Sequence, residues 1–292
     1  MMATSVYDLH AHSTCSDGAL SPTDLVTRAA GRGVTHLALT DHDTLAGLAE
    51  AQMAATHNGI ELINGVEISV TWQRKPLHIV GLGFDIGDPV LNSLLEELQL
   101  TRRQRAEKIA AKLAKKGVKE PLEHASRHAQ GRLITRPHFA RCLIEQGFAT
   151  DFESAFANYL GQGKPGFVST EWVSMENALE ALHGAGGVAI IAHPRRYRLT
   201  HSWMRRLLEA FKAMGGEAVE VVTGGGSPGD VEAMTQLAIK FDLLASVGSD
   251  FHDPINPWIE LGKLAPLPAA LVPVWKALSR PVQNKLAEST LV

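Results

Sequence analysis

The stretch Val6-Tyr7-Asp8-Leu9-His10-Ala11-His12-Ser13 places two histidines directly after a short apolar run. The apolar run predicts a β-strand, and in an extended backbone His10 and His12 point to the same side, because side chains alternate along a strand. Both imidazoles can then reach one metal ion. Two buried, hydrogen-bonded histidines would give the same pattern, so this motif alone does not establish a metal site.

Ionisable side chains also follow several later apolar runs. These positions are Thr40-Asp41-His42-Asp43, Val66-Glu67-Ile68-Ser69, Ala192-His193-Pro194 and Gly248-Ser249-Asp250-Phe251-His252. Residues directly after buried strands lie at the rim of an α/β sheet, where such enzymes place their sites. Unrelated core histidines do not explain why so many of the 13 histidines occupy one predicted rim, namely His10, His12, His42, His78, His193 and His252.

His78 begins its apolar run instead of ending it. The polar turn Gln73-Arg74-Lys75 leaves no room for a crossover helix, so the two flanking strands are predicted to form an antiparallel hairpin. In that hairpin His78 returns to the rim that carries Glu67.

Short β-branched runs alternate with amphipathic helical stretches, which predicts an α/β fold on a mainly parallel sheet. Ser21-Pro22 and Ser227-Pro228 each predict the start of a helix, since serine caps the amino end and proline fits the first turn. Seven strands suit a barrel or a strongly curved sheet, and we expect them at 6–9, 35–39, 60–69, 77–84, 188–192, 218–222 and 243–247.

The βα rhythm stops between about residues 93 and 166. Helical patterns cover residues 94–116, 136–146 and 152–160 there, so we expect a barrel domain formed by residues 1–92 and 167–292, with a helical insertion at 93–166 that covers the active site. The basic run Arg102-Arg103-Gln104-Arg105 within it is typical of a solvated helix face.

Composition limits the classes of function. With 45% hydrophobic residues the chain can bury a large core, and a formal net charge of −3 gives no global basic field for nucleic acid or membranes. We find no apolar stretch of bilayer length and no secretion signal, and therefore expect a cytoplasmic protein without a membrane partner. Cys15 and Cys142 are too few and too distant for a disulfide framework or a thiolate zinc site.

The imidazoles and carboxylates at the rim suit Mn²⁺, Zn²⁺ or Fe²⁺, and a bridging carboxylate implies more than one ion. Such ions activate water and neutralise charge on a transferring phosphoryl group, which predicts phosphoester hydrolysis. Nearby cations offer a grip on phosphate oxygens: Arg136, Lys164, Arg195 and Arg196. The loop around Lys164 lacks the spacing of a P-loop.

Taken in order, these motifs resemble those of the PHP (polymerase and histidinol phosphatase) superfamily. The matching residues are Asp8-Leu9-His10-Ala11-His12-Ser13, Thr40-Asp41-His42-Asp43, Gly65-Val66-Glu67, His78, Ala192-His193-Pro194 and Gly248-Ser249-Asp250-Phe251-His252. The resemblance spans nearly the whole chain. It implies a distorted (β/α)7 barrel with two or three divalent metal ions, for which we expect Mn²⁺, with Zn²⁺ or Fe²⁺ as alternatives.

The resemblance also implies a ligand set. His10, His12, Glu67 and Asp250 would hold one ion, and Glu67 would bridge to a second ion held by His78 and His193. Asp17, His42 and His252 would hold a third. Because trinuclear relatives often have a histidine near the position of Asp17, the identity and occupancy of the third ion stay open.

The chain resembles the YciV/TrpH-like branch most, because Tyr159-Leu160-Gly161-Gln162-Gly163-Lys164-Pro165-Gly166 ends the insertion and Arg195 follows the His193 motif. That branch implies release of the 3'-phosphate from nucleoside 3',5'-bisphosphates and, in some members, 5'-to-3' trimming of short RNA. The alternatives are a histidinol-phosphate-type phosphomonoesterase and a non-catalytic, polymerase-associated module.

We expect a nucleotide or short RNA as partner and see no sign of an obligate protein partner. Arg136, Lys164 and Arg195 are expected to hold a phosphate, and His193 or Asp250 to assist proton transfer. Tyr159 is placed to stack on a base or to pack in a core. Further candidates are Asp41 for catalysis and Ser13 and Arg196 for phosphate binding.

Overall fold

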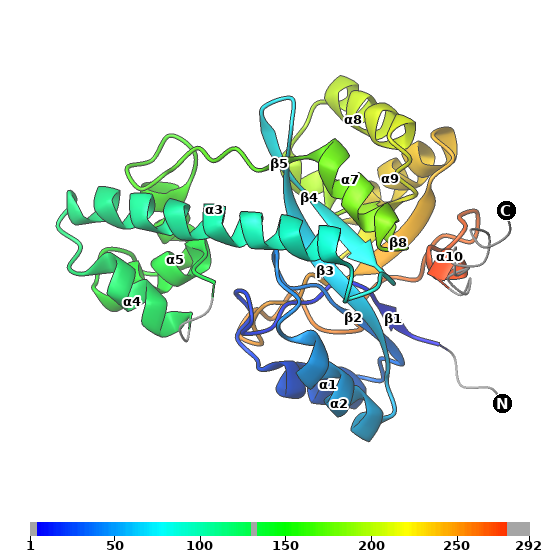
Figure 1. Cartoon of the computed structure of the whole chain (residues 1–292), viewed down its shortest axis with the longest axis horizontal. Helices are drawn as coiled ribbons and strands as arrows, with labels where there is room; N and C mark the ends of the chain where they lie inside the picture. The colour runs from blue at the N-terminus through cyan, green and yellow to red at the C-terminus, as the bar shows by residue number, and fades with distance from the viewer. Residues whose placement is uncertain (1–4, 130–132, 279–292) are drawn as a thin grey trace, which may run out of the picture.

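The structure, a computed structural model, describes residues 5–129 and 133–278. Its centre is one strongly curved sheet (Figure 1). The strands are β1 (Tyr7–Asp8), β2 (His36–Leu39), β3 (Glu61–Trp72), β4 (Lys75–Leu82), β5 (Val173–Ser174), β6 (Val188–Ile191), β7 (Ala218–Thr223) and β8 (Leu244–Gly248). They lie in the order β1-β2-β3-β4-β6-β7-β8, and the short β5 pairs with β3.

The sheet closes on itself nearly completely. Along this path neighbouring strands are parallel, except that β4 runs antiparallel to β3 and β6. The first and last strands meet where the Leu9 N–H donates to the Val247 carbonyl at 3.0 Å and the Asp250 N–H donates to the His10 carbonyl at 2.8 Å. The predicted seven-stranded barrel and the predicted hairpin are therefore confirmed, whereas the two-residue β5 was not expected.

Helices cover the outside of the barrel, and both predicted helix starts are confirmed. Ser21 caps α1 by accepting the Asp24 N–H at 3.0 Å, and Ser227 caps α9 by accepting the Asp230 N–H at 3.2 Å. The helices outside the insertion are α1 (Pro22–Gly31), α2 (Leu48–Asn58), α7 (Met175–Gly184), η2 (Pro194–Tyr197), α8 (His201–Ala213), α9 (Pro228–Lys240) and α10 (Trp275–Leu278).

A group of helices projects to one side of the barrel (Figure 1). It comprises α3 (Pro89–Ala114), α4 (Pro121–His128), α5 (Arg136–Glu145), α6 (Phe152–Ala155) and the π-helix η1 (Phe156–Leu160). The predicted helices are present, and α4 is an additional one. The division of the chain into domains at residues 93 and 166 remains a prediction.

One expectation for α3 is wrong. Arg102 does not lie on a solvated face, because its side chain is buried against the barrel and its Nε donates to Asp43 Oδ2 at 2.5 Å. The sequence run could not reveal this, since the partner carboxylate lies 59 residues earlier in the chain.

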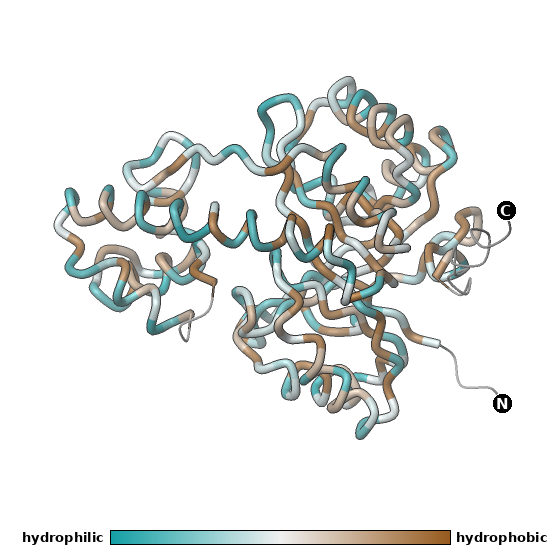
Figure 2. Tube along the Cα trace, in the orientation of Figure 1, coloured by the Kyte–Doolittle hydropathy of each residue, from teal (hydrophilic) through white to brown (hydrophobic). Residues whose placement is uncertain are grey.

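Apolar side chains hold the sheet together. Hydrophobic residues are concentrated along the central segments of the chain in Figure 2. A small cluster takes Val80 from β4, Ile190 from β6 and Leu9, which directly follows β1, and a larger one fills the space between the sheet and the helices. Both leave the carboxyl ends of the parallel strands to polar residues. Within the described part of the chain, none of the helices has the length and apolar character needed to cross a membrane.

Candidate metal centre

The structure brings together residues from six strands at one rim of the barrel. His10 and His12 follow β1, His42 follows β2, His193 follows β6, and Asp250 precedes His252 after β8; Glu67 lies in β3 and His78 in β4. Four overlapping groups of ligand atoms each lie within 4.8 Å of one another: His12, Asp17, His42 and His252; His10, His12 and Glu67; His10, His193 and Asp250; His42, Glu67 and His78.

Backbone conformation aims several of these side chains. His193 and Asp250 have positive φ angles of 28° and 53°, in a region that residues other than glycine seldom adopt. Such conformations persist where the surroundings fix them, and they gather at functional sites. Here the His193 N–H donates to Glu220 Oε2 at 2.5 Å, and the Asp250 N–H is held by His10.

Glu67 lies at the middle of the cluster and contacts imidazoles with both oxygens. Its Oε1 is 2.8 Å from His78 Nδ1 and 2.8 Å from His193 Nε2. Its Oε2 is 2.8 Å from His42 Nδ1 and 3.3 Å from His12 Nε2. A carboxylate in this position can bridge two cations.

Two aspartates flank Glu67. Asp250 Oδ1 lies 3.2 Å from His12 Nε2 and 3.4 Å from His10 Nε2, while its other oxygen pairs with Arg196. Asp17 reaches His252 Nε2 at 3.3 Å from Oδ1, which extends the cluster toward the helical insertion.

The spacing of these atoms fits divalent cations. Ligands about 2.0–2.2 Å from one ion lie about 3–3.5 Å from each other, and many of the nitrogen–oxygen distances here fall in that range. Despite these short separations, His42 Nδ1, Glu67 Oε2, His193 Nδ1 and Asp250 Oδ1 are buried without a hydrogen bond of suitable geometry. Buried polar atoms normally have a partner, so the cluster is suited to binding divalent metal ions through imidazole and carboxylate groups.

The electrostatics point the same way. Although burial opposes their ionisation, neighbouring histidines hold the pKa of Glu67 and of Asp17 well below the usual range. Burial also opposes the charged form of His252, but the neighbouring Asp250 and Asp17 raise its pKa to about 9. For His12 burial dominates and lowers the pKa to about 3. The carboxylates thus stay ionised, and their negative charge would be balanced by divalent cations bound at the centre.

Glu220 supports the cluster from behind, and the sequence analysis missed it. Its Oε1 lies 2.7 Å from His10 Nδ1, which leaves His10 Nε2 facing the other ligands. Gly248 makes room for this contact, because a Cβ there would lie 2.3 Å from the His10 Cβ and 2.9 Å from Glu220 Oε1. A glutamate inside the apolar run Ala218–Thr223 was the available signal.

Asp41 stands apart from the cluster. Its oxygens accept hydrogen bonds from the Ser13 and Ser16 hydroxyls, each at 2.6 Å, and burial raises its pKa to about 6. Asp41 and Ser13 therefore hold the loop after β1 in shape. On these contacts we assign them to positioning the site, while their roles in catalysis and phosphate binding remain predictions.

A cavity of roughly 310 Å³ adjoins the cluster at Asp17, His42 and His78. Four arginines also line the cavity: Arg74, Arg102, Arg105 and Arg136. Of these, the sequence analysis predicted only Arg136 to bind phosphate. Arg105 Nε is buried without a partner, and burial together with Arg136 and Arg102 lowers the pKa of Arg105 to about 9. These crowded cations favour an anion in the cavity.

The other predicted phosphate-binding residues lie elsewhere. Arg196 pairs with Asp250 at the cluster and donates a hydrogen bond to the Gly224 carbonyl at 3.4 Å. Arg195 is paired with Asp230 at 2.7 Å, and Lys164 is exposed outside the lining of the cavity. Tyr159 packs edge-on against Phe148 among the apolar residues of the helical group. The structure thus brings Arg136 and Arg196 to the site, but not these three.

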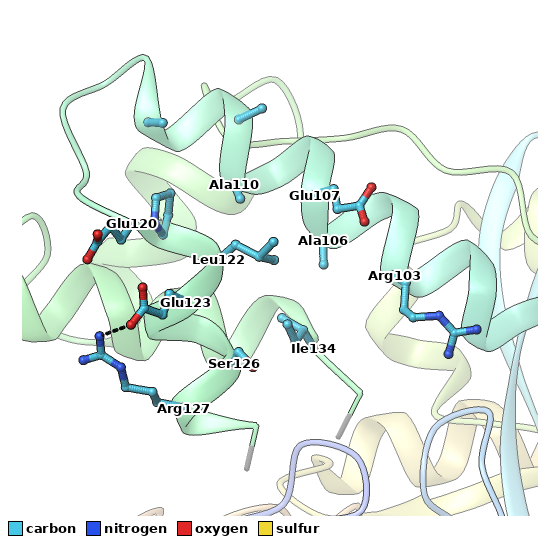
Figure 3. Close-up of a pocket in the computed structure, with 13 residues that line it drawn as sticks. Arg103, Ala106, Glu107, Ala110, Glu120, Leu122, Glu123, Ser126, Arg127 and Ile134 are labelled. Carbon is cyan, nitrogen blue, oxygen red and sulfur yellow. Dashed lines mark hydrogen bonds and ion pairs between the residues drawn. The ribbon is translucent and has the colours of Figure 1, made fainter. Parts of the chain in front are cut away.

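A larger hollow of about 1040 Å³ lies in the helical group (Figure 3). Its walls come from α3, α4 and Ile134, with Ala106 and Ala110 at the base and Glu123 paired to Arg127 at the edge. It is formed away from the strand ends and takes no part in the metal centre.

Comparisons with known proteins agree with this geometry. A 5'-3' exoribonuclease from Haemophilus influenzae is 48% identical over 273 residues, which cover 94% of this chain and 99% of the relative. A 3',5'-nucleoside bisphosphate phosphatase from Chromobacterium violaceum is 43% identical over 272 residues, covering 93% of this chain and 95% of the relative.

Solved structures add the same likeness in three dimensions. An amidohydrolase from Chromobacterium violaceum, solved with bound sulfate and no metal, matches with a TM-score of 0.89 at 43% identity, covering 94% of this chain and 96% of the other. The PHP domain model matches residues 8–223, which contain all of the clustered ligands except those after β8. With this match, the nearly closed seven-stranded sheet and the histidines at its strand ends, the chain belongs to the PHP domain family.

Proposed function

We propose that this chain is a metal-dependent phosphoesterase that removes the 3'-phosphate of nucleoside 3',5'-bisphosphates, such as adenosine 3',5'-bisphosphate, and trims short RNA from its 5' end. The observation that carries the proposal is the arginine-lined cavity beside the metal centre. The centre takes the phosphoryl group that reacts, and the cavity takes a second phosphate on the same substrate. We also propose that the protein acts in the cytoplasm.

Metal ions would be held by the clustered imidazoles and carboxylates. We assign His10, His12, Glu67 and Asp250 to one ion, Glu67, His78 and His193 to a second, and Asp17, His42 and His252 to a third. Mn²⁺ is our proposal for the metal. When bound, such ions supply Lewis-acid polarisation of the phosphoryl oxygens and activation of water.

Residues of the chain then bind, orient and move protons. Arg136 and Arg105 bind the remote phosphate, and because guanidinium groups pair with phosphate oxygens in a fixed geometry, they set the distance of the scissile bond from the cluster. Arg196 neutralises the outer side of the centre. Asp250 stays ionised, and we assign the assistance of proton transfer to Asp250 or His193.

The proposal is tested by phosphate release from adenosine 3',5'-bisphosphate by manganese-reconstituted protein, with AMP and histidinol phosphate assayed beside it. We expect preferential release from the bisphosphate and loss of that activity in His193→Ala. Activity on histidinol phosphate alone would assign the chain to the monoesterases, and no activity on any substrate would refute hydrolysis of this kind.

Arg136→Ala tests the role of the cavity. We expect KM for adenosine 3',5'-bisphosphate to rise at least about tenfold, because a charge-assisted contact to phosphate is lost, while bound metal measured by elemental analysis stays at the wild-type level. Arg103→Ala, on the exposed side of α3, is the control. Loss of metal in Arg136→Ala would show that Arg136 supports the centre instead of the substrate.

A further inference from the structure

The turn between β3 and β4 lies beside α8 (Figure 1), and three cations meet there. Arg74 lines the cavity beside the metal centre, and Lys75 follows it at the start of β4. Lys75 Nζ lies 4.9 Å from the centre of the Trp203 ring on α8, and the Arg206 guanidinium lies 5.7 Å from the centre of the same ring. We call the surface formed by Arg74, Lys75 and Arg206 the basic edge.

No carboxylate of the described residues neutralises the basic edge. Its three side chains form no ion pair there, whereas Arg195 and Arg196, which precede α8, both pair with aspartates. Unpaired cations around one aromatic ring repel each other, although a chain with a formal net charge of −3 has acidic residues enough to pair them. A negatively charged ligand would relieve this repulsion.

The backbone of the turn also points to a ligand. Gln73 and Arg74 form the turn with φ angles of 48° and 61°. Two-residue hairpin turns with positive φ at both positions usually contain asparagine, aspartate or glycine, because a larger side chain is strained there. Strained residues gather at functional sites, and the arginine in this turn lines the cavity.

The basic edge borders both the cavity and the metal centre. Arg74 belongs to the edge and to the cavity lining, and His78, which belongs to the centre and to the same lining, lies three residues after Lys75 in β4. Under the proposed function, the first nucleotide of an RNA fills the cavity and the centre, so its later phosphates lie outside both. The unpaired cations of the edge are available to these phosphates, and a single-stranded backbone is a ligand that positively charged surfaces bind.

We propose that the basic edge binds backbone phosphates of a single-stranded RNA whose 5'-terminal nucleotide occupies the cavity and the metal centre. This inference rests on the proposed function and adds a binding surface to it. Contacts to phosphate position an RNA without reading its bases. A nucleoside bisphosphate has no further phosphates, so the basic edge distinguishes RNA from mononucleotide substrates.

The test removes the two cations outside the cavity, in Lys75→Gln/Arg206→Gln, and leaves Arg74 in place. Binding of a fluorescent, 5'-phosphorylated RNA hexanucleotide is measured by anisotropy over a series of salt concentrations. All proteins are reconstituted with manganese and carry His193→Ala to prevent cleavage. We expect Kd to rise at least about fivefold and the slope of log Kd against log salt concentration to fall by about 1.4, since each phosphate contact of a single strand contributes about 0.7.

Two further variants separate charge from packing. Lys115→Gln/Lys116→Gln is the matched control, because it removes the same charge from two exposed lysines at the end of α3 that lies far from the barrel (Figure 1). It should change neither Kd nor the salt slope. Lys75→Arg/Arg206→Lys keeps both charges but changes the packing on Trp203, and it should bind the RNA as tightly as the parent protein does.

Hydrolysis of adenosine 3',5'-bisphosphate, measured with His193 in place, tells the failure of this inference from failure of the proposed function. Its kcat/KM should be the same in Lys75→Gln/Arg206→Gln and in wild type. Weaker RNA binding with a smaller salt slope supports the basic edge even if the bisphosphate is not hydrolysed. An unchanged slope, an equal change in the control, or no RNA binding by the parent protein overturns the inference, as would binding to phosphatidylserine vesicles in place of RNA.

Discussion

Glu220 shows how a residue outside the ligand set can govern the metal centre. It accepts from the His10 ring with one oxygen and from the His193 backbone with the other, so it orients two of the clustered imidazoles at once. Partners of this kind fix the tautomer and direction of metal-binding histidines. Local sequence patterns found the histidines because they end strands, but Glu220 lies within a strand, and only the fold shows what it faces.

Glu220→Gln should weaken metal binding about 10- to 100-fold, because an amide NH₂ would face the His193 N–H and the negative charge behind His10 would be lost. Competition with a chelator measures the affinity, and circular dichroism checks the fold. The matched control is Glu217→Gln, which alters a half-buried carboxylate three residues earlier that pairs with His183. Equal metal affinity in wild type and Glu220→Gln would contradict the role.

At the scale of elements, α3 links the helical group to the barrel. Arg102 of α3 contacts Asp43 and also donates to Ser69 Oγ at 2.8 Å, and its guanidinium lies 5.2 Å from the centre of the Trp172 ring. Asp43 directly follows His42. The position of the helix and the position of a clustered histidine are thus coupled through one buried ion pair.

Arg102→Met should lower the free energy of unfolding by about 3 kcal/mol or more, because it leaves Asp43 buried without a counter-charge. Urea denaturation of the metal-free protein measures this. Arg103→Met, the exposed neighbour on the same helix, should change it by less than about 0.5 kcal/mol. Similar values for the two variants would show that the buried pair contributes little.

The first turn of α5 contains a buried histidine, His138, that makes the fold sensitive to acid. The Thr135 N–H donates to His138 Nδ1 at 3.0 Å, and burial lowers the pKa of His138 from 6.5 to about 4. As pH falls below 6.5, the unfolded chain binds a proton that the folded protein does not. The stability is therefore full above pH 6.5 and is lost as pH falls toward 4.

From these pKa values, the loss at pH 5 relative to pH 7 is about 2 kcal/mol. His138→Asn keeps an acceptor for the Thr135 N–H but does not titrate, so it should lose less stability than wild type over this range. Denaturation of both proteins at the two pH values gives the difference, in which the other histidines cancel. Equal pH dependence would show that His138 is not the titrating group.

For the whole molecule, the metal centre ties six strands together at one rim. Metal ions that bind the folded state alone stabilise it, and a concentration of about 100 Kd contributes about 2.7 kcal/mol. Mn²⁺ should raise Tm of the metal-free protein by about 4 °C, as measured by scanning fluorimetry. The shift should be smaller in His12→Ala, which removes a ligand of one of the ions, and a shift of the same size in that variant would place the stabilising ions elsewhere.

Sequence reasoning reached the barrel and the gathering of its strand-end residues because both follow from local patterns. Apolar runs give the strands, and the turn at Gln73-Arg74-Lys75 gives the reversed strand that returns His78 to the rim. Of the cavity arginines it reached Arg136 but not Arg102 and Arg105, since these two look like surface residues until α3 is placed on the barrel. Contacts between distant elements decide such side chains, and composition does not encode them.

The ring closure between β1 and β8 has a consequence for synthesis of the protein. His10 and His12 share ligand groups with Asp250 and His252, which are made some 240 residues later. A ribosome must therefore extend the chain beyond His252 before these two groups are complete. A nascent chain that stops before β8 retains the groups formed by residues 10–78 but lacks the ligands that complete the centre.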